Sequence, residues 1–106
     1  MNDIKNSIVL QDDLIINYVV EIRDIFVDAL TISGNSEFDF SRVSAIDISG
    51  LQLLISLFKE SVLLGINIKL IGEFREEFKN DLNKILFCSE PINNIIDLTT
   101  FIKSVI

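Results

Sequence analysis

The sequence predicts an α/β fold: a mostly parallel β-sheet with an antiparallel N-terminal strand, packed by about four helices. Short stretches of strand-like composition alternate with longer stretches whose apolar residues recur at helical spacing. The chain has 106 residues, of which 49% are hydrophobic and 24% charged, a balance typical of a folded protein. Only four Gly and one Pro interrupt it, so residues 1–106 are expected to form a single domain without a linker.

The first half of the chain is predicted to form a hairpin, a helix and a further strand. Ser7–Leu10 and Leu14–Asn17 flank a polar turn and are expected to pair as two short strands. A helix is expected from about Tyr18 to Thr31, because apolar residues then recur at helical spacing. Glu37–Ser41 alternates apolar and polar residues as a strand does. The helix residues predicted to face the core are Val19, Ile22, Phe26 and Ala29.

The second half is predicted to begin with a long helix from Ser49 to about Leu64, which Gly65 ends. Ile66–Ile71 is expected to be a strand, and the spacing of apolar residues predicts a helix over Phe74–Leu86. The long helix is predicted to contribute Leu51, Leu54, Leu57, Phe58 and Val62 to the core.

The C-terminal tail follows Pro91 and is predicted to contain two short elements. Ile95–Leu98 is expected to be a strand, and the residues from Thr99 to Ile106 a closing helix. Thr99 or Asp97 is expected to be the N-cap of that helix.

The charge balance and hydropathy exclude several classes of partner. The net charge of −7 would repel a nucleic-acid backbone or an anionic membrane surface. The longest apolar runs fall far short of the about 20 residues that a membrane-spanning helix needs, and Met1–Lys5 does not begin a signal peptide. The single cysteine, Cys88, is expected to be a buried thiol in a reducing compartment. We therefore expect a cytoplasmic protein without direct membrane insertion.

The residue types offer little for catalysis. The sequence contains no histidine, which removes the usual metal ligand and the usual general base near neutral pH. It has no P-loop and no glycine-rich nucleotide loop. We expect no cofactor, no metal site and no catalytic residue. One enzymatic alternative stays open, in which Asp39 and Asp47 hold magnesium for phosphoryl chemistry.

The informative segment is Phe38–Leu54, in which a short strand leads through a polar loop to the start of a helix. The first turn of a helix favours a phosphate, because it offers unpaired N–H groups and a partial positive charge. Ser49 is expected in such a turn, two residues after Asp47. The same spacing also fits a structural role, in which Asp47 or Ser49 is simply the N-cap of the helix.

The pattern D-F-S-x-V-x-x-I-D-x-S-G-L runs from Asp39 to Leu51. It resembles the central signature of STAS domains, a family named for sulfate transporters and anti-sigma factor antagonists. The predicted order of strands and helices resembles that family over nearly the whole chain. The resemblance implies a regulatory protein that works by binding other proteins and is not an enzyme.

In the antagonist branch of STAS proteins, a partner anti-sigma factor that is itself a serine kinase phosphorylates the serine just before the glycine. The matching residue here is Ser49, so the resemblance implies a docking module that phosphorylation of Ser49 switches off. The family's aspartates match Asp39 and Asp47, which are expected to lie near the docking surface or to shape the loop. The residues expected to bind the partner are Asp39, Ser41, Asp47, Ile48, Ser49, Gly50 and Gln52.

The match to the antagonist branch is incomplete. Classical antagonists have Asp-Ser-Ser-Gly-Leu-Gly, whereas this chain has Ile48 in place of the first serine and Gln52 in place of the last glycine. The short N-terminus and the run Gly-Leu-Gln-Leu-Leu at Gly50–Leu54 resemble instead a compact STAS branch, in which some members are encoded with chemotaxis components and some serve lipid transporters. This resemblance implies an alternative function as a constitutive accessory subunit of a chemotaxis or transporter complex, with Ser49 as a helix cap.

Four further residues near the motif have two interpretations. Ser41 and Ser44 are possible modification sites, but their surroundings are typical of turn residues. Arg42 and Lys59 are candidates to complete a phosphate site beside Ser49, and each also fits a solvated surface position.

Overall fold

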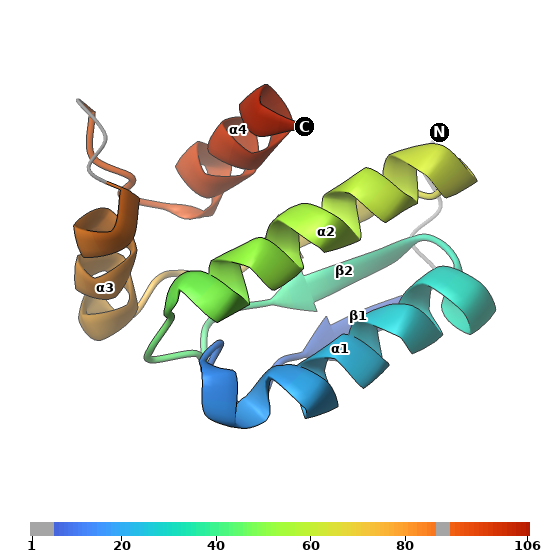
Figure 1. Cartoon of the computed structure of the whole chain (residues 1–106), viewed down its shortest axis with the longest axis horizontal. Coiled ribbons are helices and arrows are strands. Elements are labelled where there is room, and N and C mark those ends of the chain that lie inside the picture. The colour runs from blue at the N-terminus through green and yellow to red at the C-terminus, as the bar shows by residue number, and fades with distance from the viewer. Residues whose placement is uncertain (1–5, 87–89) are drawn as a thin grey trace.

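The computed structural model describes residues 6–86 and 90–106, which form a three-stranded sheet and four α-helices (Figure 1). The α/β class and the number of helices agree with the sequence-based prediction. In chain order the elements are β1 (Asn6–Val9), a 3₁₀ turn (Ile16–Tyr18), α1 (Val19–Asp28), a π-helical turn (Ala29–Ser33), β2 (Ser36–Asp39), α2 (Ile48–Leu64), β3 (Ile68–Ile71), α3 (Glu76–Leu86) and α4 (Ile95–Val105).

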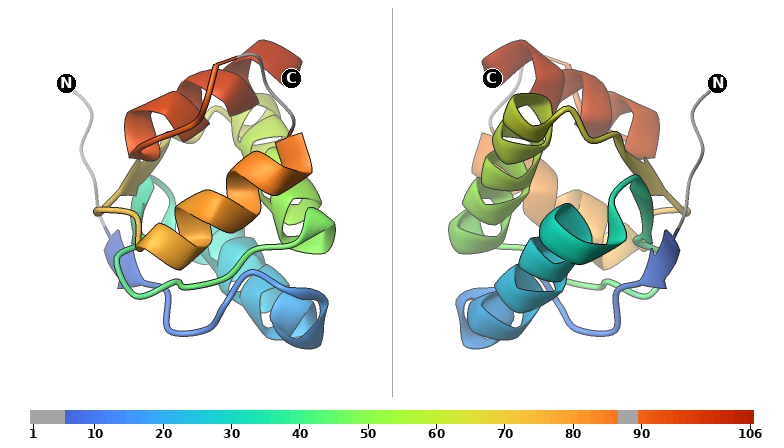
Figure 2. Two further views of the ribbon diagram at one scale, coloured as in Figure 1. Left: turned by 90° about the vertical axis from the view of Figure 1, so that its left-hand side faces the viewer. Right: turned by 90° about the vertical axis from the view of Figure 1, so that its right-hand side faces the viewer.

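The sheet has the order β1-β2-β3, and both pairings are parallel. Phe38 in the central strand lies in register with Ile8 on one side and Leu70 on the other. The connections run through α1 and α2, which lie on the same face of the sheet (Figures 1 and 2). This placement is the one expected for successive right-handed crossovers between neighbouring parallel strands.

The predicted antiparallel pairing of Ser7–Leu10 with Leu14–Asn17 is wrong. β1 pairs with β2 in parallel, and Leu14 forms a further parallel bridge with Ile46. The Leu14 carbonyl also accepts a hydrogen bond from the N–H of Asp47 (3.0 Å). The chain after β1 therefore continues alongside the segment that follows β2, and a 3₁₀ turn leads it into α1. Leu14 is fully buried in this position. A hairpin turning away from β2 would lose the free energy gained by burying this side chain.

The sheet buries one face only, which follows from the alternation of side chains along each strand. Ser36 and Phe38 of β2 are buried beneath the helices. Ser7, Glu37 and Lys69 lie side by side across the opposite face, where Ser7 and Lys69 are exposed. The fully buried apolar residues that form the core include Leu14, Ile22, Ala29, Phe38, Phe40, Val43, Leu54, Phe78, Leu82, Leu98 and Ile102.

The helix α2 is the longest element and spans the sheet. It ends as predicted at Gly65, whose φ of 68° is the left-handed conformation that glycine adopts easily. The prediction that Val62 belongs to the core is wrong, because its side chain is 68% exposed. Each residue turns the helix by about 100°, so Val62 points outward from a stripe whose last buried member is Ser61. The other predicted core residues, Leu51, Leu54, Leu57 and Phe58, are buried.

The helix α3 lies at the end of the sheet where β2 finishes (Figure 1). It begins at Glu76, two residues later than the predicted start at Phe74. Phe74 nevertheless packs against Phe78, with ring centroids 4.7 Å apart, and Phe78 meets Phe40 edge to face at 5.9 Å. This aromatic cluster joins α3 to the segment that leads toward α2.

The predicted strand over Ile95–Leu98 is wrong, because these residues are the first turn of α4. The N-cap is Asn94, whose side chain accepts from the N–H of Asp97 (2.8 Å). The Asp97 carboxylate accepts in return from the N–H of Asn93 (3.0 Å), so two N–H groups at the helix start are satisfied reciprocally. With this cap in place, Leu98 and Ile102 face the core one turn apart.

In residues 6–86 and 90–106, no helix is long and apolar enough to cross a membrane. Cys88 lies outside these residues, so its expected burial stays a prediction.

Candidate functional site

The start of α2 is organised by Asp47, which is its N-cap and has an extended backbone. One carboxylate oxygen of Asp47 accepts from the N–H of Gly50 (3.1 Å). The other accepts from the N–H of Ile16 (2.9 Å), at the 3₁₀ turn before α1. The Asp47 carboxylate therefore caps α2 and joins its first turn to a segment 31 residues earlier in the sequence.

Gly50 is a glycine for a packing reason. It is buried, and a Cβ at this position would overlap the Leu14 carbonyl oxygen and lie 2.7 Å from the Leu14 carbonyl carbon. The helix can approach the parallel bridge at Leu14 only because residue 50 has no side chain. Gly50 contributes no side chain to the surface of the predicted docking region. Its role there is to let the first turn of α2 pack closely against Leu14.

Ser49 is the second residue of α2 and is half-buried. Because Asp47 is the cap, the interpretation of Ser49 as N-cap is wrong. Within the described part of the chain, no group forms a hydrogen bond with the Ser49 hydroxyl, and no buried side-chain oxygen or nitrogen is left unpaired. Solvent therefore reaches the Ser49 hydroxyl, which has no hydrogen-bond partner among the described residues.

The residues around Ser49 form a surface with both apolar and polar groups. Ile48, the first residue of α2, is 58% exposed and places an apolar side chain on this surface. Gln52, one turn along α2, is also exposed. A shallow hollow of about 550 Å³ lies beside Ile48, between the start of α2 and α3. Its lining consists of Ile15, Ile46, Asp47, Ile48, Asp81, Lys84 and Ile85.

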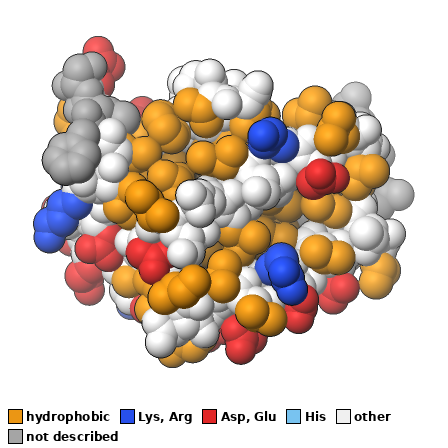
Figure 3. All heavy atoms as spheres, in the orientation of Figure 1, with side chains coloured by type: hydrophobic (Ala, Val, Ile, Leu, Met, Phe, Trp, Pro, Cys, Tyr) orange, Lys and Arg blue, Asp and Glu red, His pale blue; other side chains and the backbone are white. Residues whose placement is uncertain are grey.

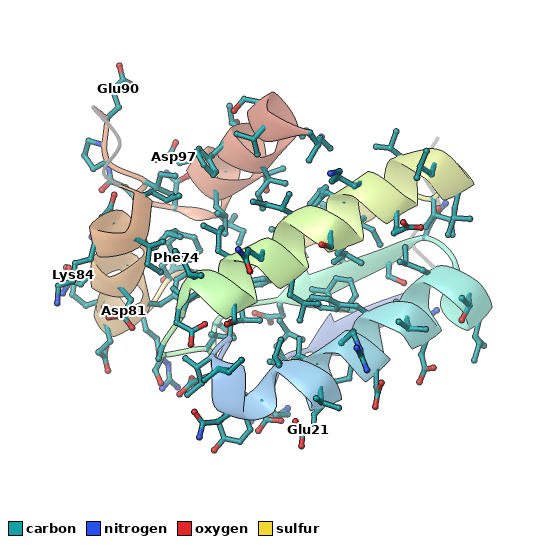
Figure 4. The ribbon with its side chains drawn as sticks, viewed as in Figure 1. Glu21, Phe74, Asp81, Lys84, Glu90 and Asp97 are labelled. Carbon is teal, nitrogen blue, oxygen red and sulfur yellow. The ribbon has the colours of Figure 1, made fainter. Side chains whose placement is uncertain are left out.

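The loop between β2 and α2 is held by carboxylates from distant segments. Asp13 accepts from both the N–H (2.9 Å) and the hydroxyl (3.0 Å) of Ser44. Asp81 of α3 accepts from the N–H of Ile46 (3.3 Å), and Figure 4 shows Asp81 and Lys84 projecting from α3 at the end of the molecule where α2 begins. These acids fix the entry to α2. Sequence reasoning missed both, because 31 and 35 residues separate each acid from the group that it binds.

Asp39 shapes the first turn of that loop. Its carboxylate accepts from the N–H of Ser41 (2.8 Å), and the Ser41 carbonyl accepts from the Arg75 side chain (3.1 Å). Gly72, with a φ of 100°, passes so close to the Asp39 carboxylate that a Cβ would overlap it. The sequence-based expectation that Asp39 shapes the loop matches this geometry, and Arg75 is a further participant that no motif indicated.

The predicted site residues fall into two groups. Asp47, Ile48, Ser49 and Gly50 occupy the cap and first turn of α2, and Gln52 follows one turn after Ile48. Asp39 and Ser41 lie in the turn that ends β2, where they contact each other and residues Gly72 and Arg75 of the segment between β3 and α3.

Arg42 and Lys59, the two basic residues predicted to complete a phosphate site beside Ser49, have other surroundings. Lys59 is ten residues beyond Ser49, which places it about 15 Å along the helix axis, beside Val62 and Leu63. Arg42 is exposed and donates to the Gln11 side chain (3.4 Å). The cation that borders the hollow beside Ile48 is instead Lys84.

The described residues contain no group of three or more His, Cys, Asp or Glu placed to hold a metal ion. The carboxylates of Asp39 and Asp47, which were the candidates for such a role, both accept backbone hydrogen bonds.

No protein-family model matches this sequence, and no curated protein matches it either. The structure is similar to that of mouse Slc26a9 (solute carrier family 26 member A9), an anion transporter captured in the inward-facing state. The TM-score is 0.60, the sequence identity is 15%, and the match covers 98% of this chain but 18% of the transporter chain. The likeness is one of fold, and it supports a STAS-like fold for this chain.

Proposed function

We propose that this chain acts as one STAS-like regulatory module that binds a partner protein through the start of α2 and the loop before it. Phosphorylation of Ser49 by a partner serine kinase would release the partner, as in an anti-sigma factor antagonist. The observation that carries the proposal is the free Ser49 hydroxyl in a first turn whose cap is already supplied by Asp47. If a serine were the N-cap, its phosphorylation would remove the cap. Phosphorylation of Ser49 would leave the cap in place, because Asp47 supplies it.

The electrostatics of the first turn support a switch that leaves the fold intact. A phosphate on Ser49 would add about −1.5 to −2 charges at neutral pH. The N-terminal end of α2 accommodates negative charge, because its peptide dipoles point their positive end there. Both oxygens of Asp47 already accept backbone N–H groups, so its charge is partly compensated. The modification would therefore change the surface rather than unfold the helix.

The docking surface itself combines an apolar contact with a site of new charge. Ile48 presents an exposed apolar side chain next to Ser49, and the hollow beside it is bordered by Ile15 and Ile85. A partner that covers Ile48 would bury the Ser49 hydroxyl with it. A phosphate at that position would have to be desolvated on docking, which is costly unless a cation meets it.

The test compares variants of the docking surface in binding to a partner isolated from the source organism. We expect Ile48→Ala and Ser49→Asp to weaken binding, and Ser49→Ala to leave it intact. Ser104→Asp near the end of α4 is the control for added charge, because Ser104 is an exposed helical serine that lies outside the docking surface. The proposal fails if Ser49→Asp and Ser104→Asp have the same effect.

A second candidate function is that of a constitutive accessory subunit of a transporter complex. The observation that favours it is the fold likeness to part of an anion transporter chain. In that case the chain would co-purify with membrane transport proteins, and neither phosphatase treatment nor Ser49→Asp would change the yield of the complex.

A further inference from the structure

A groove between α1 and α2 is formed by one stripe of residues from each helix. In both helices the lining residues recur at spacings of three, one and three, which places them along one face over two turns. The groove has a volume of about 250 Å³. One wall consists of Arg23, Phe26 and Val27 of α1 with Leu30 of the π-helical turn that continues it, and the α2 wall consists of Leu53, Ser56, Leu57 and Glu60.

The surface around this groove, which we call the helical face, is unusually apolar. The 17 residues of α2 contain only two charged side chains, Lys59 and Glu60. Val20 of α1 is 55% exposed, and Leu63 of α2 is 77% exposed. Figure 3 shows apolar side chains gathered over α1 and α2 on this side, with acidic side chains concentrated below them. An exposed apolar surface bordered by charges is typical of a protein interface.

Two opposite charges border the groove without pairing. Within the part of the chain that the structure describes, Arg23 and Glu60 form no ion pair and no hydrogen bond. The helices α1 and α2 run in the same direction (Figure 1). Arg23 begins the α1 stripe and Glu60 ends the α2 stripe, so the two charges lie at diagonally opposite corners of the groove.

We propose that the helical face binds a second copy of this chain as a symmetric dimer. A twofold axis lying in the interface, midway between Arg23 and Glu60 and perpendicular to the line joining them, sets Arg23 of each copy against Glu60 of the other. The apolar walls of the two grooves then cover each other, and both charges at the corners are paired. A twofold interface must be complementary to itself, and this distribution of charge meets that condition.

The overall charge also favours this face for self-association. Two copies of a chain with a net charge of −7 repel one another. The charged residues of the groove and of α2, Arg23, Lys59 and Glu60, include two cations and one anion. The groove and the α2 side of the helical face thus carry a single carboxylate, and the α1 acids Glu21, Asp24 and Asp28 lie outside the groove lining. The proposal does not depend on Ser49, which lies outside the groove.

The experiment is sedimentation velocity on the purified chain over a wide range of concentrations, with a charge exchange across the proposed interface. We expect the unmodified chain to dimerise. Arg23→Glu and Glu60→Arg should each weaken dimerisation at least tenfold, because each sets like charges against one another. The double variant should recover to within threefold of the unmodified chain.

The two single variants separate pairing from general repulsion. Arg23→Glu makes the net charge more negative by two units, and Glu60→Arg makes it less negative by two units. If general repulsion alone governed association, Glu60→Arg would strengthen dimerisation. Lys69→Glu, on the exposed face of β3, changes the charge as Arg23→Glu does and should have little effect. Circular dichroism checks that each variant is folded.

Three outcomes would overturn the proposal. The first is a chain that stays monomeric at the highest concentration, which would leave the helical face to a different protein or to solvent. The second is a double variant that dimerises no better than the single ones. The third is a loss on Lys69→Glu as large as that on Arg23→Glu.

Discussion

The carboxylate of Asp47 accepts the backbone N–H of Ile16 at 2.9 Å, which joins the first turn of α2 to the turn that precedes α1. The same carboxylate caps α2 through Gly50. An aspartate that appears in the motif as a neighbour of Ser49 is thus a structural residue, and it holds the segment on which Ser49 lies.

Asp47→Ala should destabilise the protein by about 1 to 2 kcal/mol, because it removes the helix cap and the link to Ile16. Asp47→Asn should cost less, since the amide keeps one acceptor oxygen. Urea denaturation gives both values. A loss below about 0.5 kcal/mol for Asp47→Ala would show that water replaces these bonds without cost.

Gly50→Ala should destabilise the protein by about 3 kcal/mol or more, because the new methyl group would overlap the Leu14 backbone, which cannot move without breaking its bridge to Ile46. Gln52→Ala on the exposed side of the same helix is the control and should change stability by less than about 0.5 kcal/mol. Equal effects of the two substitutions would contradict the close approach of α2 to Leu14.

Leu54→Ala should lower the free energy of unfolding by about 2 to 5 kcal/mol, since Leu54 is fully buried on the core-facing side of α2. Val62→Ala, two turns further along, should cost less than about 0.5 kcal/mol because Val62 faces solvent. Thermal or urea unfolding separates the two. A large loss of stability on Val62→Ala would contradict its exposed position and favour the sequence-based prediction that Val62 is a core residue.

Asn83→Asp should destabilise the link between α3 and the segment before α4. The Asn83 amide donates to the Ile92 carbonyl (2.9 Å) and accepts from the Ile92 N–H (2.8 Å), a pairing that requires both a donor and an acceptor. An aspartate keeps the acceptor but sets a negative oxygen against the carbonyl, so we expect a loss of about 1 to 3 kcal/mol. Asn83→Gln keeps the amide group but lengthens the side chain by one methylene, so it tests whether the position of the amide opposite Ile92 matters. A stability unchanged by Asn83→Asp would contradict this pairing.

Much of the architecture followed from local signals in the sequence. The predicted start of α2 at Ser49 is within one residue of the observed start at Ile48, because aspartate and serine are residues favoured at a helix N-cap. The end at Gly65 followed from the preference of glycine for the left-handed conformation. The helix over residues 19–28 was found by the spacing of Ile22 and Phe26.

One error arose where distant parts of the chain decide the outcome, and another where a local helix cap outweighs the preference of the residues that follow it. The polar residues 11–13 between two short apolar stretches favour a hairpin that includes Leu14, whereas the partner of Leu14 is Ile46, 32 residues later. Ile95 and Ile96 favour a strand by their branched side chains, but the cap at Asn94 makes them the start of a helix. The burial of Gly50 likewise depends on Leu14 and could not be inferred from the motif.

The proposed switch is tested most directly by the affinity of the partner for the chain with phosphoserine at position 49, compared with the unmodified chain. The control carries phosphoserine at position 104, and circular dichroism of all three forms should be the same. The account predicts that phosphorylation of Ser49 weakens binding at least tenfold, about 1.4 kcal/mol, whereas the control binds as the unmodified chain does. Equal affinity of the Ser49-phosphorylated and unmodified forms would contradict the switch and leave Ser49 as an exposed residue of a constitutive subunit.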